Sequence, residues 1–468
     1  MVRTALDASP GYLKQPFSHV HSFVVDRSNW IVCVRRVFPI ANIEAGMKTV
    51  AMVSDITDGG AAIACRRLAG AIKSRGVWTV RWLAGTGDPR TGAEIVSAWP
   101  PLFSLLRFRL AWRLGGARVR NRAWATLHNA AMAAAVRRQM PSVIHLHNIH
   151  HGLSFDLVRR LPRKVPIVWT LHDMETLTGS CFHSGSCRAF RDGCRQKCPS
   201  DALLNLSAGP PSKEWSCREA FYRKSRERLV WVAPSQWMYD QARARFADSM
   251  RVELIHHGIP SDIFRPCPDR AAVRAALGLG NCSGPVLMAA AHSFSSEFKG
   301  ADVLIRLMAI LAERMPNAVL VILGDWPPEK KPAAGCWVYA GRIVEERLLN
   351  LYYNAADLFV HASRFDTAPL VLLEAAAAGL PAVAFAVGGC AEMVQDGKTG
   401  FLASEISASA LAMAVERFLA LAAPAREAMR SACRKRVERQ FSPAIQAARH
   451  EALFEDLVAR KQNNARSG

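Results

Sequence analysis

Short apolar runs alternate with longer amphipathic stretches along most of the chain. A continuous apolar run of this kind is typical of a strand that is buried on both faces of a parallel sheet. The stretches between the runs repeat their apolar positions at helical spacing. Two series of strands alternating with helices predict an α/β fold with two doubly wound parallel sheets. The runs lie at residues 49–56, 77–83, 142–147, 165–171, 229–234 and 252–256, and then at residues 286–292, 318–324, 338–341, 357–363 and 382–387.

This pattern divides the chain into four parts. Residues 1–46 show no clear period, and we expect them to be either a flexible extension or an artefact of the choice of start site. Residues 47–258 predict a first Rossmann-like domain and residues 259–441 a second, while residues 442–468 predict a final helix. A chain of 468 residues is long enough to build both cores.

The formal net charge of +21 is large. It predicts attraction to nucleic acid, to an anionic membrane face or to phosphorylated substrates. Half of the residues are apolar, which excludes a disordered protein, and no uninterrupted apolar run reaches the ~18 residues of a spanning helix. The N-terminus has no signal-peptide pattern, and most of the 12 cysteines are scattered as in a cytosolic protein. We therefore expect a cytoplasmic location.

Residues 101–140 contain eight arginines and no acidic residue. The arginines alternate with Phe, Leu, Trp and Ala, which predicts a pair of interfacial helices on anionic lipid. The alternative is the solvated basic face of ordinary helices. The arginines occupy positions 107, 109, 113, 118, 120, 122, 137 and 138.

Residues 364–391 carry the strongest chemical signal. They follow a predicted buried strand and read as a short loop, a helix from Leu370, and a second strand that ends at two glycines. A helix N-terminus offers free N–H groups and a positive dipole end, so the loop before it can hold a diphosphate. Asp366 and Glu374 bracket that position and could accept hydrogen bonds from sugar hydroxyls at the two ends of the diphosphate. The alternative is a plain strand–loop–helix unit in which Asp366 caps the helix.

These residues resemble the E-x7-E region of retaining GT-B glycosyltransferases of family 4, with Asp366 in place of the first Glu and Glu374 as the second. The resemblance covers about residues 47–460. It implies a GT-B fold, in which two Rossmann-like domains face each other across a cleft and the C-terminal helix crosses back to the first domain. It also implies that Asp366 contacts the donor sugar and that Glu374 holds the ribose. The backbone N–H groups of Thr367, Ala368, Leu370 and Val371 would then face the diphosphate.

Other predicted site residues follow from the same resemblance. Lys299 matches the lysine of an Arg–Lys pair that grips the diphosphate, and His172 matches a histidine that contacts the transferred sugar. Gly59 and Gly60 form a glycine turn after the first strand, which implies a loop lining the cleft. Arg342 lies in the loop that reads the nucleobase in the family.

The implied reaction transfers a sugar from a UDP- or GDP-sugar to an acceptor hydroxyl with retention of configuration. No plausible D-x-D motif is present, so we expect no catalytic metal. The expected acceptor is a polyprenyl-diphosphate-linked oligosaccharide in polysaccharide assembly. The expected location is the anionic cytoplasmic face of the inner membrane, and nucleic acid is not an expected partner.

Residues 179–200 form a loop with four cysteines, Cys181, Cys187, Cys194 and Cys198. Four thiols among Gly, Ser and Arg cannot form a hydrophobic core, and a structural zinc ion would clamp such a loop. Unpaired structural thiols, disulfides or a redox role are the alternatives. The segment also resembles one found in a family 4 subgroup that builds exopolysaccharide. Four histidines between positions 145 and 151 predict the polar lining of a cleft rather than a metal site.

Two other functions remain open. A nucleotide-sugar epimerase with the same fold would need neither the basic segment nor the cysteine loop. A nucleic-acid-binding protein would use the net charge, with exposed aromatic side chains interleaved among its basic residues.

Overall fold

The computed structural model describes residues 47–96, 117–150, 152–196, 198, 210–330, 332 and 334–466. The predictions for residues 1–46 lie outside the described part of the chain. So does the part of the arginine-rich segment that precedes Ala117.

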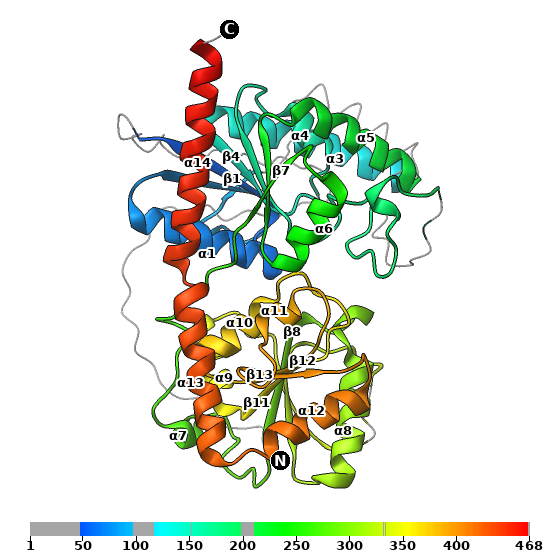
Figure 1. Cartoon of the computed structure of the whole chain (residues 1–468), viewed down its shortest axis with the longest axis vertical. Helices are drawn as coiled ribbons and strands as arrows, with labels where there is room; N and C mark the ends of the chain where they lie inside the picture. The colour runs from blue at the N-terminus through cyan, green and yellow to red at the C-terminus, as the bar shows by residue number, and fades with distance from the viewer. Residues whose placement is uncertain are drawn as a thin grey trace, which may run out of the picture. The chain divides into compact units, whose positions relative to one another are not determined.

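The first sheet has seven parallel strands in the order β3-β2-β1-β4-β5-β6-β7 (Figure 1). Strand β1 lies in the middle, where Val50 is in register with Val80 of β2 and Val143 of β4. Its strands are β1 (Thr49–Ile56), β2 (Thr79–Thr86), β3 (Glu94–Ile95), β4 (Val143–Leu146), β5 (Ile167–Thr170), β6 (Leu229–Ala233) and β7 (Arg251–Leu254). The helices around it are α1 (Gly59–Arg75), α3 (Ala117–Arg138), α4 (Asp156–Arg160), α5 (Pro211–Ser225) and α6 (Gln236–Phe246), with short 3-10 turns at Pro89–Thr91 and Ala189–Arg191.

The second sheet has six parallel strands in the order β10-β9-β8-β11-β12-β13. Its strands are β8 (Val286–Ser293), β9 (Val319–Asp325), β10 (Cys336–Gly341), β11 (Leu358–His361), β12 (Ala382–Phe385) and β13 (Gly400–Ala403). The remaining helices are α7 (Arg270–Ala276), α8 (Ala301–Arg314), α9 (Glu346–Ala355), α10 (Leu370–Ala377), α11 (Cys390–Met393), α12 (Ala408–Leu419), α13 (Ala423–Gln440) and α14 (Pro443–Arg466), with a 3-10 turn at Glu297–Lys299. Each sheet, together with its covering helices, forms a domain, and the two are named the first and the second domain.

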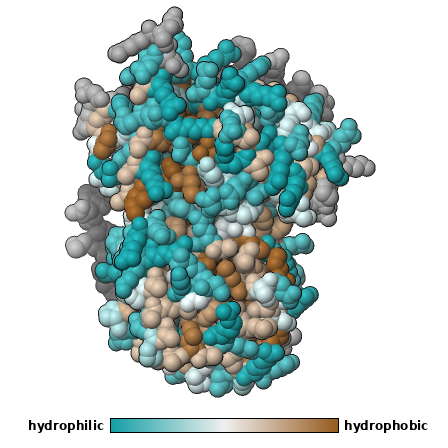
Figure 2. Space-filling view, viewed as in Figure 1, coloured by the Kyte–Doolittle hydropathy of each residue, from teal (hydrophilic) through white to brown (hydrophobic). Residues whose placement is uncertain are grey.

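Both sheets are doubly wound, as predicted. Apolar side chains from each face of each sheet form separate core clusters under the covering helices. Figure 2 shows mainly hydrophilic side chains on the visible face, with apolar ones in small groups. The strand order reverses between β1 and β4 in the first sheet and between β8 and β11 in the second. In open α/β sheets, ligands bind beyond the carboxyl ends of the strands at such reversal points.

The predicted return of the C-terminal helix is confirmed. Helix α14 packs on α1, and Arg75 Nε of α1 lies 2.7 Å from a carboxylate oxygen of Glu451 (Figure 1). The two connections between the domains run side by side, because the Ile259 N–H donates to the Phe441 carbonyl at 2.8 Å. A Cβ on Gly258 would lie 2.6 Å from Pro443 Cα, so this crossing needs glycine.

No single helix in the described part of the chain is long and apolar enough to cross a membrane. One pair of consecutive helices, Ala408–Leu419 and Ala423–Asn463, together has the length and composition of a membrane span, but the pair is bent by 110°.

Candidate functional site

Residues that follow strands of both sheets meet near the N-terminus of α10. The Thr367 hydroxyl donates to the His172 carbonyl at 2.6 Å, and the Ser235 hydroxyl donates to the Thr367 carbonyl at 2.7 Å. His172 follows β5 and Ser235 follows β6 in the first sheet, whereas Thr367 precedes α10 in the second domain. The structure therefore brings His172 to the loop that carries Asp366 and Thr367.

Lys299 and Asp366 form a partly buried ion pair in this place, with side chains 34% and 18% exposed. The Lys299 ammonium donates to Asp366 Oδ2 at 2.8 Å, and His361 Nε2 lies 3.4 Å from the same oxygen. Burial alone would raise the pKa of Asp366, but Lys299 and His361 hold it well below its usual range. Burial alone would lower the pKa of Lys299, but Asp366 raises it. The site thus holds a carboxylate and an ammonium together at neutral pH.

Helix α10 begins with its first-turn amides uncapped by any side chain. Its N-cap is Pro369, so Asp366 does not cap the helix, contrary to the alternative from sequence. The loop before it presents Thr367 and Ala368, both largely buried. Free N–H groups and the positive end of the helix dipole can hold an anion here, with the Lys299 ammonium attached to the same loop through Asp366.

Two glycines fix the shape of this loop. The Gly389 N–H donates to the Asp366 carbonyl at 2.9 Å. A Cβ on Gly388 would lie 1.9 Å from the Asp366 carbonyl oxygen, and one on Gly389 would lie 2.0 Å from that of Thr367. The glycine pair that ends the sequence motif therefore lets the backbone approach the Asp366 loop closely.

We predict that Gly389→Ala displaces the loop. The added methyl must push the Thr367 carbonyl away, which should lower the free energy of unfolding by about 1–3 kcal/mol and reduce kcat/KM. Thermal unfolding and initial rates check this. Gly70→Ala is the matched control, because a Cβ there meets nothing within 4 Å. If Gly389→Ala had the stability and rate of the wild type, the close approach of Gly389 to the Thr367 carbonyl would not be what fixes the loop.

Glu374 lies buried on α10, with both carboxylate oxygens engaged. Its Oε1 lies 2.8 Å from Arg67 Nη2, and its Oε2 accepts from the Tyr353 hydroxyl at 2.9 Å. Arg67 belongs to α1 of the first domain and also contacts Glu346 at the start of α9, with 3.1 Å between Nη2 and Oε1. Sequence reasoning missed Arg67 and Tyr353. The only signal was a pair of arginines interrupting the otherwise apolar pattern of α1.

The two glycines after β1 begin helix α1, rather than forming a separate turn before Ala61 as predicted. Asp58 caps α1 by accepting from the Gly59 N–H at 2.7 Å, and Gly59 has a φ of 80°, which favours glycine. A Cβ on Gly60 would meet nothing within 4 Å. Asp58 also forms an ion pair with Arg342, and its Oδ2 lies 3.3 Å from His292 Nε2. Arg342 of the predicted nucleobase loop thus pairs with the first domain, a partner that the sequence did not suggest.

Five histidines form a continuous column of rings next to this site. Successive ring centroids, from His450 through His145, His147 and His172 to His257, are 5.1, 4.4, 5.1 and 5.4 Å apart. His172 Nε2 and His147 Nδ1 are 2.9 Å apart and share a proton. His145 and His147 were predicted to line a cleft but are buried inside the first domain.

The histidine column predicts that the folded protein loses stability in acid. Burial lowers the pKa of every ring in it, for His450 to about 4. The unfolded chain therefore binds more protons than the folded chain below pH ~6.5, and stability falls as the pH drops from there towards 4. For His450 alone the loss should be on the order of 3 kcal/mol. Denaturant unfolding between pH 7.5 and 4.5 measures it. In His450→Gln, the free energy of unfolding should fall less steeply with decreasing pH than in the wild type. An unchanged slope would contradict the contribution of His450 to the acid sensitivity.

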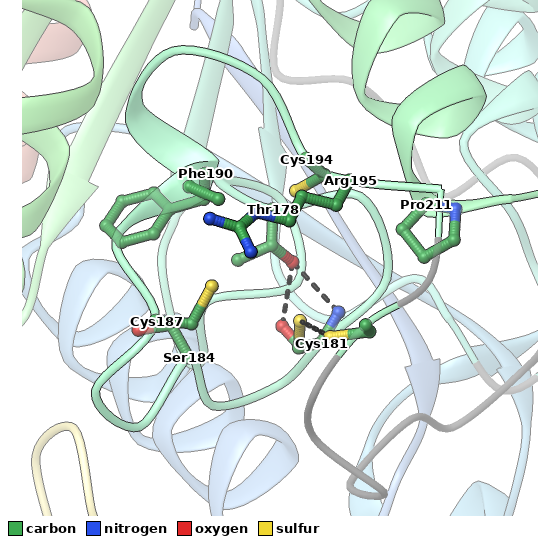
Figure 3. A pocket seen from close by; sticks show the side chains of 10 residues that line it. Thr178, Cys181, Ser184, Cys187, Phe190, Cys194, Arg195 and Pro211 are labelled. Atoms are coloured by element: carbon green, nitrogen blue, oxygen red, sulfur yellow. Dashed lines mark hydrogen bonds between the residues drawn. The ribbon is translucent and has the colours of Figure 1, made fainter.

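The four cysteines of the loop line a small cavity of about 20 Å³, together with Arg195 (Figure 3). Cys181 Sγ and Cys198 Sγ are 3.9 Å apart, and the Gly179 N–H donates to Cys194 Sγ at 3.2 Å. Burial and then Cys198 raise the pKa of Cys181 to about 12, so this thiol is protonated. Among the described residues, no group of three or more His, Cys, Asp or Glu side chains has an arrangement that could hold a metal ion. The thiols converge, but their present arrangement is not a metal cage.

Zinc in this loop stays a prediction. Freshly purified protein should contain about one zinc per chain, and Cys194→Ser should lower that content and the thermal stability of the loop. Elemental analysis before and after dialysis against a chelator measures this. Protein without zinc would leave the alternative of unpaired structural thiols.

Two family models match the chain. Residues 58–263 match the model "Glycosyltransferase Family 4", and residues 284–420 match "Glycosyl transferases group 1". Each match falls on one of the two sheets.

Among curated relatives, WcaC of Escherichia coli K12, a glycosyl transferase assigned to colanic acid biosynthesis, is 29% identical over 288 residues. This stretch is 58% of the present chain and 67% of WcaC. A D-inositol 3-phosphate glycosyltransferase of Streptomyces scabiei is 34% identical over 172 residues, which are 33% of the present chain and 38% of that relative. The match to the Streptomyces scabiei enzyme thus spans less than half of its length.

Among solved structures, HepE of Anabaena in complex with UDP-glucose has a TM-score of 0.62 and 14% sequence identity. The match covers 87% of the present chain and 99% of HepE. At this identity the likeness concerns the fold.

Proposed function

Because the chain belongs to the group 1, family 4 glycosyltransferases and has their GT-B fold, we propose that it moves a sugar from a UDP- or GDP-sugar to a hydroxyl of a lipid-linked glycan. The reaction would retain the anomeric configuration.

The uncapped N-terminus of α10, with Lys299 beside it, is the observation that carries the proposal. The departing nucleoside diphosphate gains negative charge as the glycosidic bond to it breaks. Lys299 and the amides of Thr367, Ala368, Leu370 and Val371 would stabilise that charge where it develops. Protein groups would thus do what a divalent cation does in enzymes with a D-x-D motif.

The other site residues would orient the donor. Asp366 and His172 would contact the transferred sugar, since the hydroxyl of Thr367, the neighbour of Asp366, donates to the His172 carbonyl. Glu374 would accept from the ribose hydroxyls. Gly59 and Gly60 would leave room for the sugar phosphate, and Arg342 would face the nucleobase. The leaving phosphate itself would take the acceptor proton, so no separate general base is needed.

The acceptor and the location are further parts of the proposal. The similarity to WcaC supports a role in polysaccharide biosynthesis. The proposed acceptor is a polyprenyl-diphosphate-linked oligosaccharide. A net charge of +21 supports docking at the anionic cytoplasmic face of the inner membrane.

Donor hydrolysis across a panel of UDP- and GDP-sugars, with a chelator arm, tests the proposal. We expect one donor to be hydrolysed slowly to the free sugar, with no loss in EDTA. Conversion of a donor to its isomer would instead indicate an epimerase. Salt-resistant binding of nucleic acid with no action on any donor would indicate the nucleic-acid alternative.

A further inference from the structure

Arg67 lies in a place where an arginine is costly. Its side chain leaves α1 of the first domain and is only 6% exposed. It stands between two carboxylates of the second domain, Glu346 and Glu374, with its guanidinium carbon 5.1 Å from the centroid of the Phe264 ring. Taking a guanidinium out of water is unfavourable unless its N–H groups find acceptors.

Only some of the N–H groups of the Arg67 guanidinium have a hydrogen-bond acceptor. Arg67 Nε donates to Glu346 at 3.2 Å, and Nη2 contacts both Glu346 and Glu374. Nη1 is buried and has no hydrogen-bond partner among the residues that the structure describes. A buried N–H group without an acceptor is rare in proteins, so each case needs an explanation. Glu374 has unused acceptor capacity as well, because its two oxygens can accept about four hydrogen bonds and use two.

The position of Arg67 suggests which ligand would accept the hydrogen bond that Nη1 can donate. Glu346 lies in the first turn of α9, directly after the loop of Arg342 that is predicted to face the nucleobase. Glu374 lies one to two turns inside α10, whose N-terminus is predicted to hold the diphosphate. A ribose lies between the base and the diphosphate of a nucleotide sugar. Arg67 touches both acids at once and therefore stands where ribose and base oxygens would be.

We propose that Arg67 is a donor-binding residue that the first domain supplies. Its Nη1 donates to an oxygen of the ribose or base, while its Nη2 holds Glu374 in place to accept from the ribose hydroxyls. The inference rests on the proposed use of a nucleotide sugar. Because Arg67 and Glu374 belong to different domains, binding of the nucleotide would also hold the domains together.

Nucleotide binding to the full chain tests the inference. Calorimetric titration with UDP and with GDP would be compared between the wild type, Arg67→Ala, Arg67→Lys and Arg66→Ala. Arg66 is the matched control, because it neighbours Arg67 and contacts Glu346 at 2.6 Å with its side chain 35% exposed. Thermal unfolding without nucleotide would be measured on the same samples.

We expect Arg67→Ala to weaken binding of the preferred nucleotide at least tenfold and Arg66→Ala to change it less than twofold. Arg67→Lys should recover the thermal stability, since its ammonium can still pair with Glu374, but not the affinity, since it lacks a second fixed N–H group. A merely structural arginine would show affinity and stability recovering together.

Two results would overturn the inference. One is equal affinity in Arg67→Ala and the wild type. The other is tighter binding in Arg67→Ala, which would mean that Arg67 occupies the ribose position and must leave it. If the wild type binds neither UDP nor GDP, the proposed function itself fails and takes the inference with it.

Discussion

Replacing Glu374 by alanine is expected to bring sugar transfer below detection. The variant loses the predicted ribose acceptor and also leaves Arg67 buried with Glu346 as its remaining carboxylate partner. Removing one partner of a buried ion pair typically costs about 3–5 kcal/mol of stability. Part of the loss in Glu374→Ala would therefore come from the fold.

Glu374→Gln separates the two effects. The amide has nearly the same shape and can still accept a hydrogen bond from the Tyr353 hydroxyl. We expect thermal stability closer to that of the wild type and a loss of about 10²-fold in kcat/KM, because a hydrogen bond to a charged group contributes ~1.5–3 kcal/mol. Initial rates with the identified donor measure this. Wild-type turnover in the Gln variant would count heavily against Glu374 as a site residue.

Replacing Lys299 by methionine is expected to lower kcat about 10²- to 10³-fold. This is the usual effect of removing one group that stabilises developing negative charge. The methionine keeps the length of the stem, so the loss would be due to the ammonium. Lys299→Arg should retain part of the rate, and single-turnover measurements at saturating donor would compare the three proteins.

The same variant should change the response to pH. In the wild type, Lys299 and His361 lower the pKa of Asp366, so the stability that this carboxylate contributes is present above its unfolded pKa and is lost only in strong acid. Without Lys299, only His361 opposes burial, so the pKa of Asp366 rises towards its unfolded value and the carboxylate contributes less stability at neutral pH. On acidification, the rate should therefore fall at higher pH in Lys299→Met, whereas its stability should fall less than that of the wild type. A pH profile parallel to that of the wild type would show that the ion pair does not control Asp366.

Local sequence predicted the central site unit well. The run before Ser363, the proline at position 369 and the glycine at position 379 set a strand, a helix start and a helix end by backbone preference alone. The structure has β11 at Leu358–His361 and α10 at Leu370–Ala377, and Gly379 has a φ of 72°. Periodicity also predicted both parallel sheets and the final helix. Boundaries moved by a few residues, as in α1, which begins at Gly59 rather than Ala61.

The partners of the charged residues were beyond local reasoning. Lys299 and Asp366 are 67 positions apart, and Arg342 and Asp58 are 284 positions apart, yet each pair is in contact. His145 and His147 were predicted to be polar lining because nothing near them in the sequence reveals the rings of His172 and His450. The cysteine spacing showed that four thiols share one loop but not how they stand to each other.

The sequence by itself determined the order of strands and helices, because backbone preferences and apolar periods act between near neighbours in the chain. The GT-B plan and the family followed from its resemblance to family 4 glycosyltransferases. The tertiary structure alone decided that Glu374 is shared with Arg67, that Asp366 pairs with Lys299 and that five histidines stack. The strength of such contacts depends on distance through space and on burial, and neither is fixed until the chain has folded.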